Sequence, residues 1–129
     1  MSERFQIYKC EVCGNIVEVL HSGMGELVCC NQPMKLLKEK TQEAQGKEKH
    51  IPVIEENNKK VKIKVGSILH PMEENHYIEW IEILTSAGTI KKFLKPGDKP
   101  EAIFKVSERA TAVRSYCNIH GLWKKLFNV

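Results

Sequence analysis

Apolar and polar positions alternate along much of the second half of the chain. The stretch "VKIKV" places Val61, Ile63 and Val65 on one face and two lysines on the other, as expected for a half-buried strand. The stretch "YIEWIEIL" alternates poorly but is rich in β-branched and aromatic residues, which suits a central strand covered on both faces. Further short apolar segments are separated by turn residues such as "KPGDKP". Because no segment has a convincing amphipathic helical pattern, we predict a mostly β fold built around an antiparallel sandwich.

A polar stretch interrupts this pattern before the first predicted strand of the sandwich. Residues 38–49, "KEKTQEAQGKEK", carry both charge signs and contain Gly46, a composition typical of a linker. We therefore predict three parts: a small domain over residues 1–37, a linker over 38–49 and a sandwich domain over 50–129. A chain of 129 residues is long enough for a small module joined to a medium-sized one.

The net charge of +4 is unevenly distributed between these parts. Residues 1–49 hold seven Lys/Arg and seven Asp/Glu, whereas residues 50–129 hold thirteen and nine. This excess is too small for a dedicated nucleic-acid binder but sufficient to attract a small anion. The charged N-terminus and the lack of any apolar run of membrane-spanning length argue against a signal peptide and a membrane partner, so we expect a cytoplasmic protein.

The cysteines indicate a metal site in the small domain. Cys10-x-x-Cys13, followed by Gly14, is typical of a turn that aims two thiolates at one metal ion, and Cys29-Cys30 supplies a second pair. In a reducing compartment such clustered thiols are more often ligands than disulfides. Neighbouring side chains tend to diverge, so we expect a distorted site. Four sulfurs suit zinc or iron, and a purely structural zinc ribbon remains an alternative at this point.

A second, dispersed set of metal-binding residue types lies outside the small domain. Its members are His50, His70, His76, Cys117 and His120, in "KEKHIPVIE", "HPMEENH" and "CNIH". Each segment lies at a turn beside a predicted strand, and a sandwich gathers its loops at its ends. Four nitrogens and one sulfur exceed the needs of tetrahedral zinc. Four equatorial imidazoles and an axial thiolate would leave one position open, which indicates redox chemistry.

Six segments together closely resemble desulfoferrodoxin, the two-iron family of superoxide reductases: "YKCEVCGNIVEVL", "GELVCCNQPM", "EKHIPVIE", "HPMEENHYIEWIEI", "FLKPG" and "YCNIHGLWK". The resemblance implies a rubredoxin/desulforedoxin-like domain followed by a seven-stranded immunoglobulin-like sandwich, usually in a homodimer. It also implies two iron ions per chain. The first would be held by Cys10, Cys13, Cys29 and Cys30, and the second by His50, His70, His76, Cys117 and His120.

The resemblance further implies a reaction. The family reduces superoxide to hydrogen peroxide by one electron, without forming dioxygen, and takes its electrons from rubredoxin or a similar carrier. Its "EKH" motif is present as Glu48, Lys49 and His50. Lys49 would attract the anion, and Glu48 is similar to the family glutamate that occupies the sixth iron position in the oxidised state. The alternative is an electron-transfer protein in which both irons only relay charge, which would need a closed second site that rejects anions.

Overall fold

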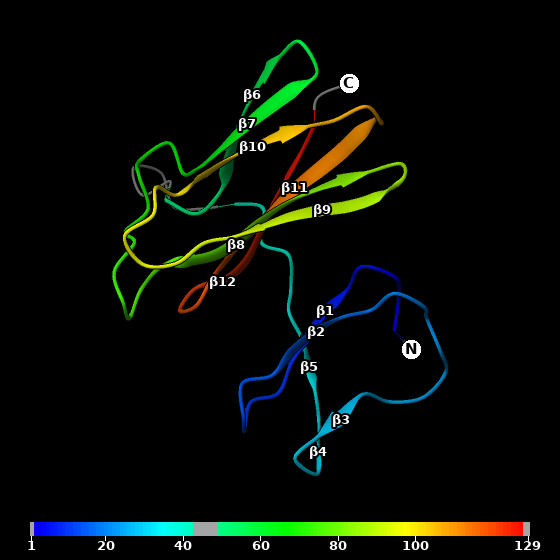
Figure 1. Ribbon diagram of the computed structural model, residues 1–129. Helices are drawn as coiled ribbons and strands as arrows, with labels where there is room; N and C mark the ends of the chain where they lie inside the picture. Colours follow the sequence, from blue (N-terminus) through cyan, green and yellow to red (C-terminus); the bar gives the residue numbers. More distant parts are fainter. Residues whose placement is uncertain (1, 43–48, 128–129) are drawn as a thin grey trace. The chain divides into compact units, whose positions relative to one another are not determined.

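The computed structural model describes residues 2–42 and 49–127 (Figure 1). Within these ranges the regular secondary structure is all β, as the sequence pattern predicted. No helix long and apolar enough to cross a membrane occurs among the described residues. The chain divides into two compact units, Met1–Lys38 and Glu39–Val129.

The first unit contains short strands and few buried side chains. Strands β1 (Ile7–Lys9), β2 (Ile16–Glu18) and β5 (Lys35–Leu36) form an antiparallel sheet in the order β2-β1-β5, and β3 (Val28–Cys29) pairs with β4 (Gln32–Pro33). The fully buried apolar side chains among its described residues are Ile7, Cys10 and Val19. So small a core provides little hydrophobic stabilisation, and a bound metal is a common substitute in domains of this size.

The described residues of the second unit form two antiparallel sheets of a sandwich (Figure 1). The three-stranded sheet has the order β10-β7-β6, and the four-stranded sheet has the order β12-β11-β8-β9. The strands are β6 (Pro52–Asn57), β7 (Lys60–Val65), β8 (Ile78–Thr85), β9 (Gly88–Phe93), β10 (Glu101–Lys105), β11 (Ala110–Cys117) and β12 (Gly121–Leu126). These strands match the predicted immunoglobulin-like sandwich.

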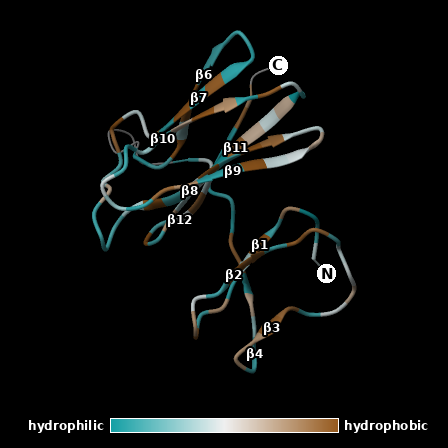
Figure 2. Cartoon of the chain, in the orientation of Figure 1, coloured by the Kyte–Doolittle hydropathy of each residue, from teal (hydrophilic) through white to brown (hydrophobic). Residues whose placement is uncertain are grey.

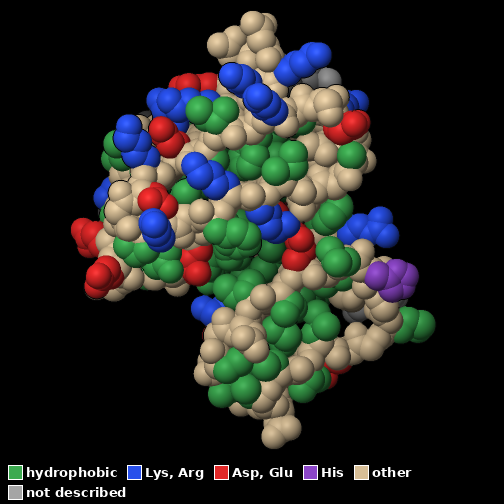
Figure 3. Space-filling model, viewed as in Figure 1, with side chains coloured by type: hydrophobic (Ala, Val, Ile, Leu, Met, Phe, Trp, Pro, Cys, Tyr) green, Lys and Arg blue, Asp and Glu red, His purple; other side chains and the backbone are tan. Residues whose placement is uncertain are grey.

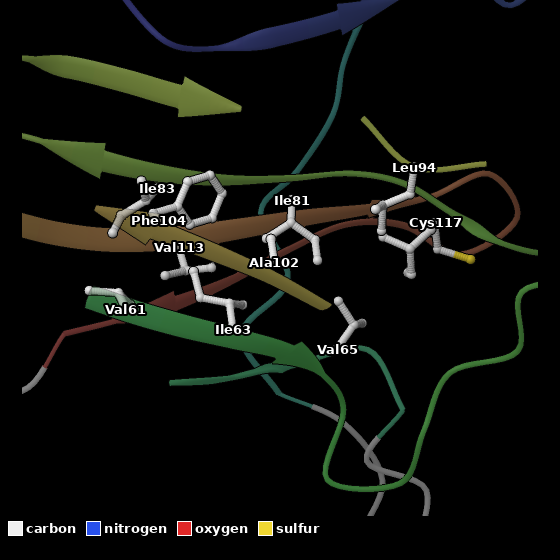
Figure 4. Close-up of a cluster of buried hydrophobic side chains, with 11 residues drawn as sticks. Val61, Ile63, Val65, Ile81, Ile83, Leu94, Ala102, Phe104, Val113 and Cys117 are labelled. Atoms are coloured by element: carbon white, nitrogen blue, oxygen red, sulfur yellow. The ribbon is translucent and has the colours of Figure 1, made fainter. Parts of the chain in front are cut away.

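The core of the sandwich follows the sequence pattern. Val61, Ile63 and Val65 of β7 are buried while the lysines between them are partly exposed, which confirms the predicted alternation. Strand β8 lies inside its sheet between β11 and β9, and side chains on both of its faces are buried, as predicted. In Figure 2 the brown, hydrophobic positions lie along the strands, and the turn between β6 and β7 is teal. Figure 4 shows Cys117 at one end of the row of core side chains, with its sulfur pointing away from the row.

The charged side chains of the sandwich are mixed rather than segregated on the face shown in Figure 3. Blue Lys and Arg side chains alternate there with red Asp and Glu side chains. Some charged side chains of the sandwich form ion pairs between neighbouring strands, such as Lys64 with Glu55 at 3.4 Å and Lys62 with Glu101 at 3.9 Å. Such pairs cancel individual charges and leave the net basic excess of residues 50–129 unchanged.

The first residues of the predicted linker pair with the sandwich. The backbone N–H of Lys40 donates to the Leu122 carbonyl at 2.9 Å, and the N–H of Lys124 donates to the Lys40 carbonyl at 2.9 Å. The Glu39 carboxylate also contacts Arg114 and Lys124, at 3.2 and 3.3 Å. The polar composition of this stretch did not distinguish a linker from an added edge strand, because exposed edge strands are also rich in charged residues. Residues 43–48 of the predicted linker lie outside the described residues.

Candidate metal centres

The four cysteines of the first unit lie together. Their Sγ atoms are all within 4.8 Å of one another, and none is in a disulfide. Cys13 Sγ lies 3.5 Å from Cys29 Sγ, which lies 3.9 Å from Cys30 Sγ. A tetrahedral ion with metal–sulfur bonds of about 2.3 Å requires sulfur–sulfur distances of about 3.8 Å. The cluster therefore fits one tetrahedral metal ion.

The turn after β1 shapes the first cysteine pair. The backbone N–H of Cys13 donates to Cys10 Sγ at 3.4 Å, and the N–H of Gly14 donates to the Cys10 carbonyl at 3.0 Å. Gly14 has φ 86°, a conformation that glycine adopts without a steric penalty. The Cys13 N–H, opposed by burial and aided by the N–H of Val12, lowers the pKa of Cys10 to about 6. This thiol is thus prepared as a thiolate, the form that binds a metal.

A tight hairpin turn brings the adjacent cysteines to the same point. Cys29 ends β3, and Cys30 and Asn31 form the turn to β4 with φ 52° and 61°. Two successive left-handed residues are typical of a type I′ turn, which reverses the chain within two residues. The nearby sulfurs of Cys13, Cys29 and Cys10 raise the pKa of Cys30 to about 12. Without a cation these thiols resist joint ionisation, so the cluster is suited to a metal ion that replaces their protons.

At one end of the sandwich, four imidazole rings form a closed cycle. The ring centroids are 4.7 Å apart for His50 and His70, 4.7 Å for His70 and His76, 5.1 Å for His76 and His120, and 4.7 Å for His120 and His50. Adjacent ring planes are inclined by 67–81°. Such a cycle places the four rings around a common centre.

The individual donor atoms support this geometry. His50 Nε2 lies 3.1 Å from His120 Nδ1, which lies 3.8 Å from Cys117 Sγ. The donor atoms of His50, His76, Cys117 and His120 are all within 4.8 Å of one another. His70 falls outside this four-residue group, although its ring completes the cycle. The Nε2 atoms of His70 and His76 are buried and have no hydrogen-bond partner in the part of the chain that the structure describes.

Unpartnered buried nitrogens are costly unless something else binds them. His70 Nδ1 lies 2.7 Å from the Pro71 carbonyl, so Nδ1–H donates there and the Nε2 lone pair remains available for a metal ion. Burial lowers the pKa of His70 to about 4, which this hydrogen bond opposes. Burial also lowers the pKa of His76, and the charge of His120 contributes in the same direction. Both rings are therefore neutral at pH 7, as ligands must be.

Loops at the ends of strands supply these side chains. His50 lies two residues before β6, and its carbonyl accepts a hydrogen bond from Ser115 Oγ at 3.2 Å. His70 and His76 lie in the β7–β8 loop, where Glu73 and His76 exchange backbone hydrogen bonds at 2.9 and 3.1 Å. Trp123 of β12 stacks on His50 with centroids 4.7 Å apart. The sequence pattern gave no sign that Trp123 lies at this site, because a buried tryptophan in a strand usually belongs to the core.

The turn that carries Cys117 and His120 repeats the arrangement at Cys10. The N–H of His120 donates to Cys117 Sγ at 3.4 Å, and Gly121 has φ 88°. The patterns "CEVCG" and "CNIHG" thus form equivalent turns, with histidine in the place of the second cysteine. Burial raises the pKa of Cys117, and the N–H groups of His120 and Ile119 oppose that effect. Buried and without a cation, this thiol would be protonated. A bound cation would hold it as a thiolate.

Of the two residues predicted to take part in the reaction, Glu48 and Lys49, the structure describes only Lys49. Lys49 is exposed next to His50, and its charge is among the causes that lower the pKa of His76, after burial and the charge of His120. Lys49 therefore lies close enough to the imidazole cycle to affect the charges there. Glu48 lies outside the described residues.

Comparison with known proteins shows the family to which this chain belongs. The family described as "Desulfoferrodoxin" matches residues 42–126, and "Desulfoferrodoxin, N-terminal domain" matches residues 2–37. The chain belongs to the desulfoferrodoxin family. The desulfoferrodoxin homolog of Archaeoglobus fulgidus is 60% identical over 124 residues, which cover 96% of this chain and 98% of that protein. The resemblance noted in the sequence is thereby confirmed over nearly the whole chain.

Two further proteins that are similar to this chain carry a functional name. The crystal structure of the superoxide reductase from Treponema pallidum has a TM-score of 0.79 and 27% identity, and the match covers 93% of this chain and 96% of that one. The superoxide reductase of Pyrococcus horikoshii is 38% identical over 96 residues, which cover 60% of this chain and 84% of that protein. The Treponema match spans both units of the present chain.

Proposed function

We infer that this chain is a superoxide reductase, an oxidoreductase that reduces superoxide to hydrogen peroxide. The observation that carries this inference is the closed cycle of four imidazoles beside a single buried thiol. Four imidazole nitrogens and one thiolate sulfur would hold a metal ion with five donors, one fewer than a six-coordinate ion takes, so that ion would be able to bind a small ligand. Relatives named superoxide reductase, of which the Treponema protein matches almost the whole chain, support the assignment.

The donor sets are suited to the two irons of the family. His50, His70, His76, Cys117 and His120 would hold one iron, and Cys10, Cys13, Cys29 and Cys30 the other. Four sulfurs in a tetrahedron suit a rubredoxin-type iron, although they bind zinc as well. Iron held at the histidine site would supply the single electron that superoxide accepts. The overall reaction combines superoxide, one electron and two protons into hydrogen peroxide, so no dioxygen forms.

Residues around the open position have separate proposed tasks. Lys49, exposed beside His50, attracts the superoxide anion and partly offsets its charge. The N–H groups of Ile119 and His120 point to Cys117 Sγ and stabilise negative charge on the sulfur. Glu48 stays a predicted ligand of the oxidised site, on the strength of the sequence motif alone.

The reaction needs electrons from outside the chain. We propose rubredoxin or a similar small electron carrier as the donor, and a homodimer as the working form, both from the family resemblance. The function would be the removal of superoxide in the cytoplasm. The exposed Cys13 and Cys30 of the four-cysteine site offer a place where an external donor could pass an electron.

Product stoichiometry tests the proposed function directly. The iron-loaded protein is supplied with a slow reductant and a known flux of superoxide, while hydrogen peroxide and dioxygen are recorded together. We expect one peroxide per superoxide consumed and no dioxygen from the enzyme. Dioxygen and peroxide in equal amounts would show dismutation instead. No acceleration, together with a histidine site that does not bind azide, would favour the alternative of an electron-transfer protein.

A further inference from the structure

Lys40 lies at a fixed position beside the histidine–cysteine site. Its backbone is hydrogen bonded on both sides to β12, through Leu122 and Lys124, and it forms a parallel bridge with Trp123. The preceding residue, Glu39, is held by Arg114 and Lys124. The position of the Lys40 backbone is thus determined by the sandwich itself, although the sequence placed it in a linker.

The ammonium group of Lys40 contacts the turn that provides two ligands. Lys40 Nζ donates to the carbonyl of His120 at 2.8 Å. The same Nζ lies 5.1 Å from the centroid of the Trp123 ring, within cation–π range. Trp123 in turn stacks on His50, at 4.7 Å and an interplanar angle of 16°. One cation therefore supports the backbone of one ligand and, through an indole, the ring of another.

We propose that Lys40 is a positioning residue of the histidine–cysteine iron site, which holds the Cys117–His120 turn in place and contributes positive charge beside the thiolate. The proposal rests on the proposed function only in taking iron as the bound metal. A positive charge near a metal favours the reduced, less positive form of that metal, and water moderates the effect at an exposed side chain. Lys40 therefore acts on the side of the ligands, whereas Lys49 acts on the incoming anion.

The charge of Lys40 lies next to a group that donates to the sulfur. Lys40 Nζ lies 2.8 Å from the carbonyl oxygen of His120, and the backbone N–H of His120 donates to Cys117 Sγ at 3.4 Å. Hydrogen bonds and charges around a ligand set its orientation and its electron donation to the metal. A lysine that anchors the turn and places its charge beside the backbone of a ligand can influence both properties.

Three variants separate this role from a general structural one. Lys40→Met removes the donor and the charge at similar length, whereas Lys40→Arg retains both. Lys105→Met makes the same change of net charge on β10. Lys105 pairs with Lys60, the first residue of β7, whereas the loop that carries His70 follows Val65 at the other end of that strand. The four-cysteine iron provides an internal reference in every sample. The measurements are iron content, the sulfur-to-iron absorption band of the oxidised histidine site, and the reduction potentials of both irons by redox titration.

We expect Lys40→Met to lower the reduction potential of the histidine-site iron and to shift its absorption band, while the four-cysteine iron keeps its potential. Lys40→Arg and Lys105→Met should match the parent. Loss of iron from the histidine site in Lys40→Met, with retention of iron in Lys40→Arg, would equally support a positioning role for Lys40.

An unchanged reduction potential and an unchanged absorption band in Lys40→Met would overturn the proposal, as would a change in Lys40→Arg as large as that in Lys40→Met. No superoxide is used, so a parent chain inactive toward superoxide would refute the proposed function and leave this test valid.

Discussion

Gly66 occupies a position where any side chain would collide with the backbone next to a ligand. Its φ is 83°, and an added Cβ would lie 2.5 Å from the carbonyl oxygens of both Lys49 and Ile68. Gly66→Ala should therefore displace the segment that leads into His50, reduce iron binding at the histidine site and destabilise the fold by roughly 1–3 kcal/mol. Iron analysis and thermal unfolding would measure both effects.

Gly97 provides the matched control for this substitution. It also has a left-handed backbone, with φ 93°, but an added Cβ would meet nothing within 4 Å. Gly97→Ala tests the backbone strain alone, so it should lower stability slightly and leave the iron spectrum unchanged. If the two variants lose the same amount of iron, close approach of Lys49 to Gly66 is not what positions His50.

The buried imidazole of His70 predicts an unusual titration of this ring in the metal-free protein. Burial disfavours the charged ring and lowers its pKa to about 4, so the ring is neutral above that pH and protonated below it. An ordinary histidine, with a pKa of about 6.5, is already largely protonated at about pH 5. The His70 ring should therefore remain neutral at about pH 5 and take up a proton only as the pH approaches 4. NMR titration of the imidazole signals would show this, and a His70 midpoint near the ordinary histidine value would contradict it.

At the scale of strands, a buried ion network joins β8, β9 and β11. Glu82 contacts Arg114, and both side chains are almost completely buried, while Lys91 lies 3.2 Å from the second carboxylate oxygen of Glu82. Glu82→Gln leaves the Arg114 charge buried with a weaker partner. Removal of one partner of a buried ion pair typically costs about 3–5 kcal/mol. We expect a loss in this range, reduced by the remaining contact of Arg114 with Glu39, in urea unfolding of the sandwich.

Glu55 on β6 is the control for that experiment. Its ion pair with Lys64 lies at the surface, at 3.4 Å, with side chains 52% and 36% exposed. Exposed pairs contribute less than about 1 kcal/mol, so Glu55→Gln should have little effect. Similar losses for Glu55→Gln and Glu82→Gln would show that burial does not set the strength of the Glu82 contact.

At the scale of the whole molecule, the two donor sets belong to separate units. The four cysteines lie in Met1–Lys38, and the histidine site lies in Glu39–Val129. Cys13→Ser should therefore abolish the absorption of the sulfur-rich ferric iron and spare both the sulfur-to-iron band of the histidine site and most of the reductase activity. Iron analysis should fall from two ions per chain to one. Loss of the histidine-site spectrum in a folded Cys13→Ser protein would contradict this separation.

Charge steering is also a property of the whole molecule, since it acts over a distance. If Lys49 attracts superoxide, Lys49→Ala should slow the second-order encounter by roughly tenfold, and added salt should slow the parent more than the variant. Pulse radiolysis of the reduced protein would provide both rates. Lys105→Ala on β10 makes the same change in net charge and should leave the encounter rate close to that of the parent. Equal salt dependence of the parent and Lys49→Ala would exclude a steering role for Lys49.

Much of this protein is determined by local sequence. The alternation in β7 and the apolar run of β8 predict their strands, because one or both faces of each strand must be buried. The two C-x-x-C/H-G patterns predict turns that present two donors at once, because the geometry depends on four successive residues and a left-handed glycine. The type of donor and the spacing of these residues were enough to indicate two metal centres.

Other features were decided only by the tertiary structure. The cycle of His50, His70, His76 and His120 requires three loops from distant parts of the chain, and their meeting depends on how the two sheets pack. The pairing of Lys40 with β12 was hidden for the same reason, since a charged stretch is compatible with a linker and with an edge strand until a partner strand is known. Local sequence thus determines which donors this chain presents, whereas long-range packing determines which of them share a metal ion and which lysines lie beside it.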